Sequence, residues 1–232
     1  KNKNNVKSFT IKISNDSWYV CFFSRDSHFD SIQRKELKIP FDIRNSDIEN
    51  FLPAMEFITK KGGYSIRIGN IQNKALENHN KKIIDYPFSK FKSEKNDFLL
   101  SIFPKFIIGC GSGIVDLSSI NDIPVGIVNC AEYEYHQNRK NVIFIPKLIR
   151  RKSNNKILKY NEYFNLIKNP KNITELNKYI NEYDLYYEEN TADDILELTK
   201  SFYSKFIENK QVNELRDENC FDDNGVSIYE PY

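Results

Sequence analysis

Short apolar runs alternate along this chain with stretches of helical periodicity, and this alternation restricts the fold more than any single motif. Such a pattern is typical of βαβ units, which build a parallel sheet. We expect strands at residues 18–23, 64–68, 106–108, 125–128 and 142–145. Their apolar residues do not strictly alternate with polar ones, as expected for strands that helices cover on both faces. The sequence therefore predicts an α/β fold, a Rossmann-like three-layer αβα arrangement with a mostly parallel sheet.

The helices expected between and after these strands have recognisable start signals. Each begins with a residue that can cap a helix N-terminus: Ser46, Ser93, Ser112 and Thr191. Glu49 follows Ser46 at the spacing of a capping box, and Asp194 could cap the last helix together with Thr191. Gly62 and Gly63 end the first helix.

The domain organisation follows from the same pattern. Residues 1–17 are expected to be a lead-in and residues 18–190 a nucleotide-sugar-binding domain. Residues 191–209 would form a helix packed on that domain, and residues 210–232 a polar tail. The chain starts at Lys1 rather than Met, so we expect a preceding domain.

Charge and composition narrow the class of protein. The 232 residues are 40% hydrophobic and 28% charged, and the net charge is +2. This suits a globular protein and argues against nucleic acid as a partner. The basic run at residues 147–159 is expected to be a solvated loop, with contact to a membrane surface as the alternative. We see no apolar stretch long enough to span a bilayer and no signal peptide, so we expect a cytoplasmic protein. If the basic run contacts a membrane, the protein would lie at the inner face of that membrane.

The cysteines and histidines do not have the spacing of metal ligands. We expect the four cysteines to be reduced, as in an intracellular protein. The three histidines are scattered, so neither a metal site nor a cofactor is predicted.

Polar residues and glycines follow the expected strands, where ligands of open parallel sheets bind. In order along the chain they are Arg25, Asp26, Arg67, Gly69, Asn70, Gly109, Gly111, Ser112, Gly113 and Asn129. The glycines allow a close backbone approach, and the N–H groups that open the next helix point at an anion. Ser112 can cap that helix and bind phosphate, while arginine offers a fork of donors. The set predicts a diphosphate site that is neutralised by protein groups rather than by magnesium.

Each of these features also has a structural interpretation. The glycine-rich turn would serve equally as a tight corner between a strand and a helix. Arg25 and Asp26 would form a surface ion pair, and Asn129 would bind loop backbone. Arg67 lies in an apolar run and needs a partner, which could be Asp85, Asp97 or a ligand phosphate.

At these residues the chain resembles a family of bacterial glycosyltransferases found with surface-polysaccharide genes. The matching segments occur in order between residues 18 and 205: 25–27, 44–54, 63–69, 85–86, 92–93, 96–99, 108–113, 124–129 and 191–195. More distantly, the chain is similar to the donor-binding half of GT-B transferases. Fucosyltransferase-like members have an H-x-R motif after the first strand, where this chain has Phe23-Ser24-Arg25.

The resemblance implies a two-domain enzyme whose acceptor domain lies upstream of this chain. It adds Lys92 and Asp97 to the substrate-binding residues. A general base would come from the acceptor side or from Asp26, His28 or Glu132. The base and sugar of the donor would be recognised by residues 86–92 and 132–139.

These features lead to the hypothesis of a glycosyltransferase donor domain that needs no metal or cofactor. It would transfer a sugar from a nucleotide-diphosphate donor to a glycan or a lipid-linked acceptor. Arg25 and Arg67 would be catalytic, stabilising the departing diphosphate, and Arg67→Ala is expected to abolish transfer with the fold intact. The alternatives are a nucleotide-sugar epimerase or hydrolase of the same architecture, and a non-catalytic module that binds nucleotide-sugar or glycan or scaffolds a partner.

Overall fold

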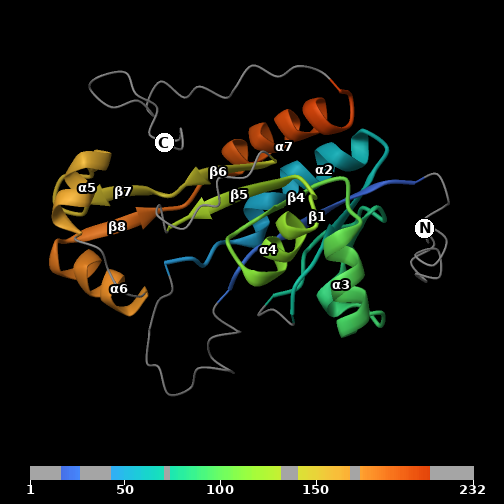
Figure 1. Ribbon diagram of the computed structural model, residues 1–232, viewed down its shortest axis with the longest axis horizontal. Coiled ribbons are helices and arrows are strands. Elements are labelled where there is room, and N and C mark those ends of the chain that lie inside the picture. The colour runs from blue at the N-terminus through green and yellow to red at the C-terminus, as the bar shows by residue number, and fades with distance from the viewer. Residues whose placement is uncertain (1–16, 27–42, 71–73, 132–140, 168–172, 210–232) are drawn as a thin grey trace.

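A six-stranded parallel sheet forms the centre of the computed structural model, which describes residues 17–26, 43–70, 74–131, 141–167 and 173–209 (Figure 1). The strands are ordered β3-β2-β1-β4-β5-β6, and every neighbouring pair is parallel. Their bounds are β1 Tyr19–Phe23, β2 Tyr64–Arg67, β3 Ile83–Asp85, β4 Ile107–Gly109, β5 Val125–Cys130 and β6 Val142–Pro146. The expected three-layer α/β fold with a mostly parallel sheet is confirmed.

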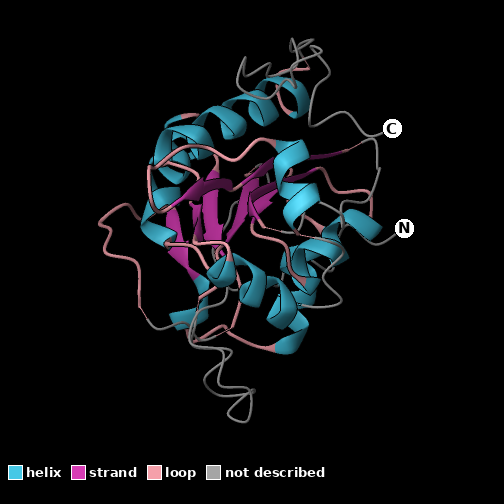
Figure 2. Ribbon diagram, turned by 90° about the vertical axis from the view of Figure 1, so that its left-hand side faces the viewer, coloured by secondary structure: helices cyan, strands magenta, loops and turns pink. Residues whose placement is uncertain are grey.

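Helices cover both faces of this sheet, as Figure 2 shows. One face carries α2 (Leu52–Lys60) and the last helix, α7 (Ala192–Phe206). The other carries α3 (Glu94–Ile102) and α4 (Gly113–Ile120). Short 3-10 helices, η2 (Ile48–Phe51) and η3 (Tyr86–Phe88), precede α2 and follow β3.

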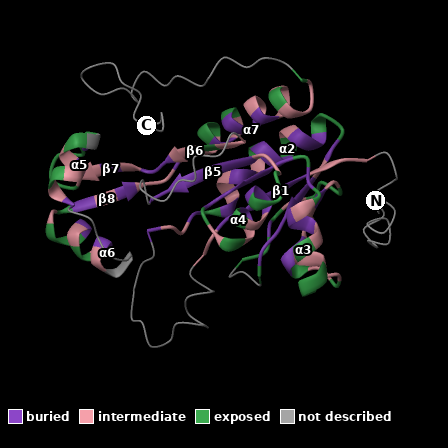
Figure 3. Ribbon diagram, in the orientation of Figure 1, coloured by how far each residue is buried: buried purple, intermediate pink, exposed green. Residues whose placement is uncertain are grey.

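The strand sequences are apolar on both sides because both sides are covered. In β1, Val20 and Phe22 pack into the cluster under α2 and α7. Cys21 and Phe23, pointing the other way, pack with residues of α3 and α4. The central strands are buried along their length, whereas the edge strands β3 and β6 are partly exposed (Figure 3).

A glycine in β5 allows α7 to lie close to the sheet. A Cβ on Gly126 would come within 2.5 Å of Ile108 Cδ1 and 3.0 Å of Leu198 Cδ2. Leu198 belongs to α7 and is fully buried. The missing side chain therefore provides the space that the helix occupies.

A second, smaller unit follows β6, next to the carboxyl ends of β5 and β6 (left side of Figure 1). It has the antiparallel strands β7 (Leu148–Arg151) and β8 (Leu185–Glu188), with α5 (Tyr160–Leu166) and α6 (Ile173–Glu182). Its apolar residues form a separate cluster, which also contains Ile43 and Ala131. The expectation of a solvated loop at residues 147–159 is therefore wrong in part. Ile149 and Leu158 are buried, and Arg150 pairs with Glu188 across the strands.

The helix start signals are confirmed at two positions and corrected at two. Ser93 and Thr191 cap α3 and α7 through their side chains. At η2 the capping side chain is that of Asp47 instead of Ser46, and the Ser112 hydroxyl makes no cap bond to α4. No helix in the described part of the chain is long and apolar enough to cross a membrane.

Gly126→Ala should lower the free energy of unfolding by about 1–3 kcal/mol, because the new methyl group overpacks the contact between β5 and α7. Gly111→Ala is the matched control, since nothing lies within 4 Å of a Cβ built there. Urea unfolding of both variants measures the difference. Equal stability of the two variants would show that α7 does not need the space at residue 126.

Candidate functional site

The sheet changes direction between β1 and β4. From β1 the chain builds outward through β2 to β3, and it then returns to the other side of β1 with β4. Ligands of open α/β sheets bind beyond the carboxyl ends of the strands at such a switch point. We call the side of the sheet where the parallel strands end the carboxyl edge.

Two predicted site segments lie side by side at this switch point. Phe23 and Gly109 are partners in the register of β1 and β4, and Cys110 N donates to Phe23 O at 3.0 Å. A Cβ on Gly109 would lie 2.8 Å from Phe23 O, so the residue must be glycine for the strands to meet. The loop that holds Arg25 and Asp26 thus starts beside the turn that holds Gly111, Ser112 and Gly113.

The N-terminus of α4 differs from the other helix starts at the carboxyl edge. The side chains of Asp47, Ser93 and Thr191 accept backbone N–H groups at the starts of η2, α3 and α7. Ser112 stands in the same position before α4, but its Oγ is buried and has no hydrogen-bond partner. The first-turn N–H groups of α4 therefore have no side-chain cap.

The glycines that flank Ser112 face open space. A Cβ on Gly111 or Gly113 would meet nothing within 4 Å, and neither residue has a positive φ. Unlike Gly109, they are not required to be glycine by packing or by backbone conformation. Their lack of side chains leaves the backbone at the start of α4 open to an approaching group.

A segment before η2 is fastened against this turn. Ser46 N donates to Arg25 O at 2.9 Å, and Ser46 Oγ lies 2.9 Å from Cys110 Sγ. The ammonium of Lys147, only 1% exposed, donates to Asn45 O at 2.6 Å. Burial raises the pKa of the Cys110 thiol, so this cysteine is held as a neutral packing residue rather than as a nucleophile.

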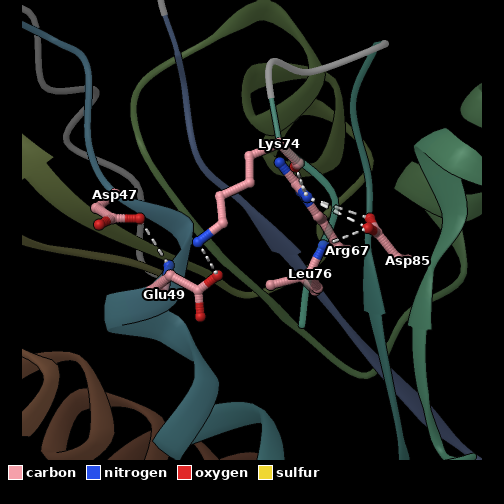
Figure 4. Close-up of polar contacts among 6 residues, drawn as sticks. All are labelled: Asp47, Glu49, Arg67, Lys74, Leu76 and Asp85. Carbon is pink, nitrogen blue, oxygen red and sulfur yellow. Dashed lines mark hydrogen bonds and ion pairs between the residues drawn. The ribbon is translucent and has the colours of Figure 1, made fainter. Parts of the chain in front are cut away.

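Arg67 is buried at the end of β2, where it binds groups of the protein (Figure 4). Its Nη1 donates to Lys74 O at 2.8 Å and lies 3.3 Å from Asp85 Oδ1. Asp85 in turn accepts the N–H of Leu76 at 2.8 Å, and Lys74 Nζ lies 3.2 Å from Glu49 Oε1. Arg67 and Asp85 thus hold residues 74–76 against β2 and β3.

The ion pair with Asp85 provides one of the partners that the sequence leaves open for Arg67. Burial lowers the pKa of the guanidinium, while the carboxylates of Asp85, Asp26 and Glu49 act in the opposite direction. Nη1 is engaged by the protein, whereas Nε is buried without a hydrogen-bond partner. The expectation that Arg67→Ala leaves the fold intact is therefore corrected. The change should destabilise the fold, because it would leave Asp85 without its cation.

Asn129 binds backbone at the end of β5. It has a φ of 55° at an irregularity in the pairing with β6. Its N–H donates to Asn190 Oδ1 at 2.6 Å, and its Oδ1 accepts from Asn190 N at 2.7 Å. Asn190 Nδ2 also donates to Pro146 O at 2.9 Å. This reciprocal pair joins the ends of β5 and β6 to the start of α7.

The remaining predicted site residues lie toward β3. Lys92 Nζ forms an ion pair with Asp97 Oδ2 at the start of α3 and stands 5.4 Å from the centre of the Tyr86 ring. Gly69 has a φ of 127°, a conformation that favours glycine, and Asn70 after it is exposed. His28, Glu132 and the 132–139 segment lie outside the described residues.

The structure thus gathers Arg25, Asp26 and the turn of Gly109, Gly111, Ser112 and Gly113 at one point, with the others spread along the same edge. Sequence reasoning missed Asn45, Ser46, Lys147 and Asn190, which fasten this edge. Ser46 did have a recognisable pattern in the sequence, but that pattern indicated a helix cap. Lys147 was not recognised because it lies in the basic run that was expected to be a solvated loop.

Unpartnered polar atoms gather along the carboxyl edge. Buried side-chain atoms without a hydrogen-bond partner include Asn45 Oδ1, Arg67 Nε, Asp97 Oδ1, Ser112 Oγ and Asn129 Nδ2. Each belongs to the end of a strand or to a segment at that edge. Buried polar groups are normally satisfied, so these atoms are candidates for contacts with water or with a ligand.

Neither metal-ligand geometry nor known relatives identify the site. In the described ranges, no three side chains among His, Cys, Asp and Glu gather so as to hold a metal ion. Comparisons of the chain with protein-family models, curated proteins and solved structures found no match.

Arg67→Met should lower the free energy of unfolding by about 3 kcal/mol or more, since it leaves the Asp85 carboxylate without its cation. The double variant Arg67→Met/Asp85→Leu should lose less than the sum of the two single variants. Lys60→Ala is the control, because Lys60 lies 3.9 Å from Glu56 in an exposed pair. Urea unfolding that gives the same result for Arg67→Met and Lys60→Ala would contradict the structural role of Arg67.

Proposed function

We propose that this chain binds the diphosphate of a nucleotide-sugar at the switch point, as the donor-binding domain of a glycosyltransferase. The observation that carries the proposal is the uncapped start of α4. Its Ser112 hydroxyl is unpartnered, and the glycines on either side face open space. Helix N-termini of this kind favour phosphate, because the free N–H groups and the helix dipole both attract an anion.

Arg25 supplies the cation in this proposal. Its loop starts at the end of β1, directly beside the turn, and Ser46 holds its carbonyl group. Arginine donates to phosphate oxygens through a planar fork, which a helix start alone does not provide. Arg67 contributes its charge from β2, with Nη1 already engaged by Asp85 and Lys74.

The chemistry that this arrangement supports is stabilisation of a leaving group. When the bond between the sugar and the diphosphate breaks, negative charge builds on the diphosphate oxygens. The N–H groups of α4, the Ser112 hydroxyl and Arg25 would be in place before that charge develops, as in an oxyanion hole. One such contact is typically worth about 3 kcal/mol in the transition state. The sugar would pass to a glycan or a lipid-linked acceptor, and the resemblance to surface-polysaccharide glycosyltransferases supports this assignment.

Ser112→Ala tests the phosphate site directly. It should leave stability unchanged, because the hydroxyl makes no cap bond, but weaken binding of inorganic pyrophosphate and nucleoside diphosphates roughly tenfold. Thr191→Ala is the matched control, since Thr191 caps α7 and its loss should cost about 1 kcal/mol of stability without changing binding. Thermal unfolding and calorimetry measure both quantities. A wild-type chain that binds neither pyrophosphate nor any nucleoside diphosphate at millimolar concentration would overturn the proposal.

A second candidate, a nucleotide-sugar-binding module without catalysis, is favoured by the state of four carboxylates at this edge. Asp85, Asp97 and Glu49 each form an ion pair with a cation of the chain. Glu189 accepts the N–H of Asp47 and lies 3.9 Å from Lys147 Nζ. A general base must be available to take a proton from the acceptor, and these carboxylates are engaged.

Product analysis separates the two candidates. The chain is incubated with donors labelled in the sugar, with and without acceptor glycans. Labelled glycan indicates a transferase, and free labelled sugar without acceptor indicates hydrolysis. Tight donor binding with no turnover under either condition would support the binding module.

A further inference from the structure

One exposed aromatic side chain lies at the carboxyl edge on the β3 side. Phe88 ends η3, which follows β3 directly, and 47% of its surface is exposed. Its ring covers Arg67, whose guanidinium carbon stands 5.9 Å from the ring centre. A large apolar ring exposed beside a buried cation is well suited to pack against a flat ligand group.

The opposite side of the switch point is closed by the chain itself. At the ends of β5 and β6, Asn129 and Asn190 bind each other, and Lys147 binds Asn45. These three anchoring contacts involve Asn129 at 1%, Lys147 at 1% and Asn190 at 5% exposure. A ligand whose phosphates lie at the start of α4 would therefore extend the other way, past residues 74–76 at the ends of β2 and β3.

The distance along the edge suits a nucleoside. Neighbouring strands lie about 4.8 Å apart, so β3 is about 14 Å from β4, after which α4 begins. A nucleoside diphosphate whose phosphates lie at the start of α4 has about this length. Along that path lies the exposed Asn70.

We propose that Phe88 is the nucleobase platform of the donor site, so that the base of the nucleoside diphosphate stacks on its exposed face. The proposal rests on the proposed function, because it places the base relative to a diphosphate at α4. Arg67 lies under the ring and supports it from behind. Stacking on an aromatic ring tolerates every base, so Phe88 supplies affinity, and other side chains distinguish one base from another.

Calorimetry with two kinds of probe tests the platform. The probes are inorganic pyrophosphate, which has no base, and a panel of uridine, cytidine, guanosine and adenosine diphosphates. Phe88→Ala should weaken binding of the nucleoside diphosphates roughly tenfold or more, and leave binding of pyrophosphate unchanged. Phe88→Trp should retain the affinity, since it keeps an aromatic face.

Two further variants exclude a merely structural role. Phe88→Leu still covers Arg67 but lacks the aromatic face, so it should lose affinity as Phe88→Ala does. Phe98→Ala removes a phenylalanine that is 48% exposed on α3 and should change neither binding constant. Thermal unfolding without ligand confirms that each variant is folded.

The outcomes distinguish this inference from the proposed function. If wild type binds pyrophosphate and nucleoside diphosphates but Phe88→Ala binds both as wild type does, the platform is wrong and the phosphate site stands. The platform is also wrong if Phe88→Leu binds nucleoside diphosphates as tightly as wild type. If wild type binds neither probe, the phosphate site itself is wrong.

Discussion

The contact between β1 and β4 at Phe23 and Gly109 is the constraint on which the rest of the site depends. The two strands come so close that a Cβ at residue 109 would collide with the carbonyl oxygen of Phe23. Because both strands are parallel, their loops leave the sheet in the same direction and from adjacent points. This backbone contact brings together the Arg25 loop and the turn before α4, although more than 80 residues of chain lie between them.

Two kinds of polar group lie along the carboxyl edge, and they have different roles. Asn129 with Asn190, Lys147 with Asn45, and Arg67 with Asp85 join segments that are far apart in the sequence. Around them stand atoms such as Ser112 Oγ, which the protein leaves unsatisfied. Satisfied pairs hold the edge rigid, and a rigid edge keeps the unsatisfied groups in fixed positions.

The sequence predicted the elements whose signals are local. The runs that became β1, β2, β4, β5 and β6 were recognisable because a strand covered on both faces is continuously apolar, and Thr191 with Asp194 identified the start of α7. β3 was missed because it is only three residues long within polar surroundings. β7 was missed because it has more arginines than buried residues, so its sequence does not look like that of a strand. It is a strand because it pairs with β8.

For the site, the sequence identified residues at the carboxyl edge but not their partners. Ser46 looks like a helix cap in the sequence, yet its hydroxyl meets Cys110, 64 residues away. Arg67 was recognised as a charge that needs a partner, and only the register of β2 and β3 shows that this partner is Asp85. Contacts of this kind depend on which strands become neighbours, and that is a property of the whole sheet.

The position of α7 has a consequence for how the chain is made. This helix covers the face of the sheet that also carries α2, and residues 192–206 pack there against side chains from residues 51–58. During synthesis, the strands of the six-stranded sheet leave the ribosome well before this helix does, so the part of this face beside α2 remains uncovered until nearly all of the described chain has been translated. Such exposed apolar surface is where folding intermediates associate, and distant contacts of this kind also slow folding. A chain truncated before residue 192 would keep every described strand and the turn before α4. The part of the face that α7 covers would stay exposed, so this chain should require chaperones to stay in solution.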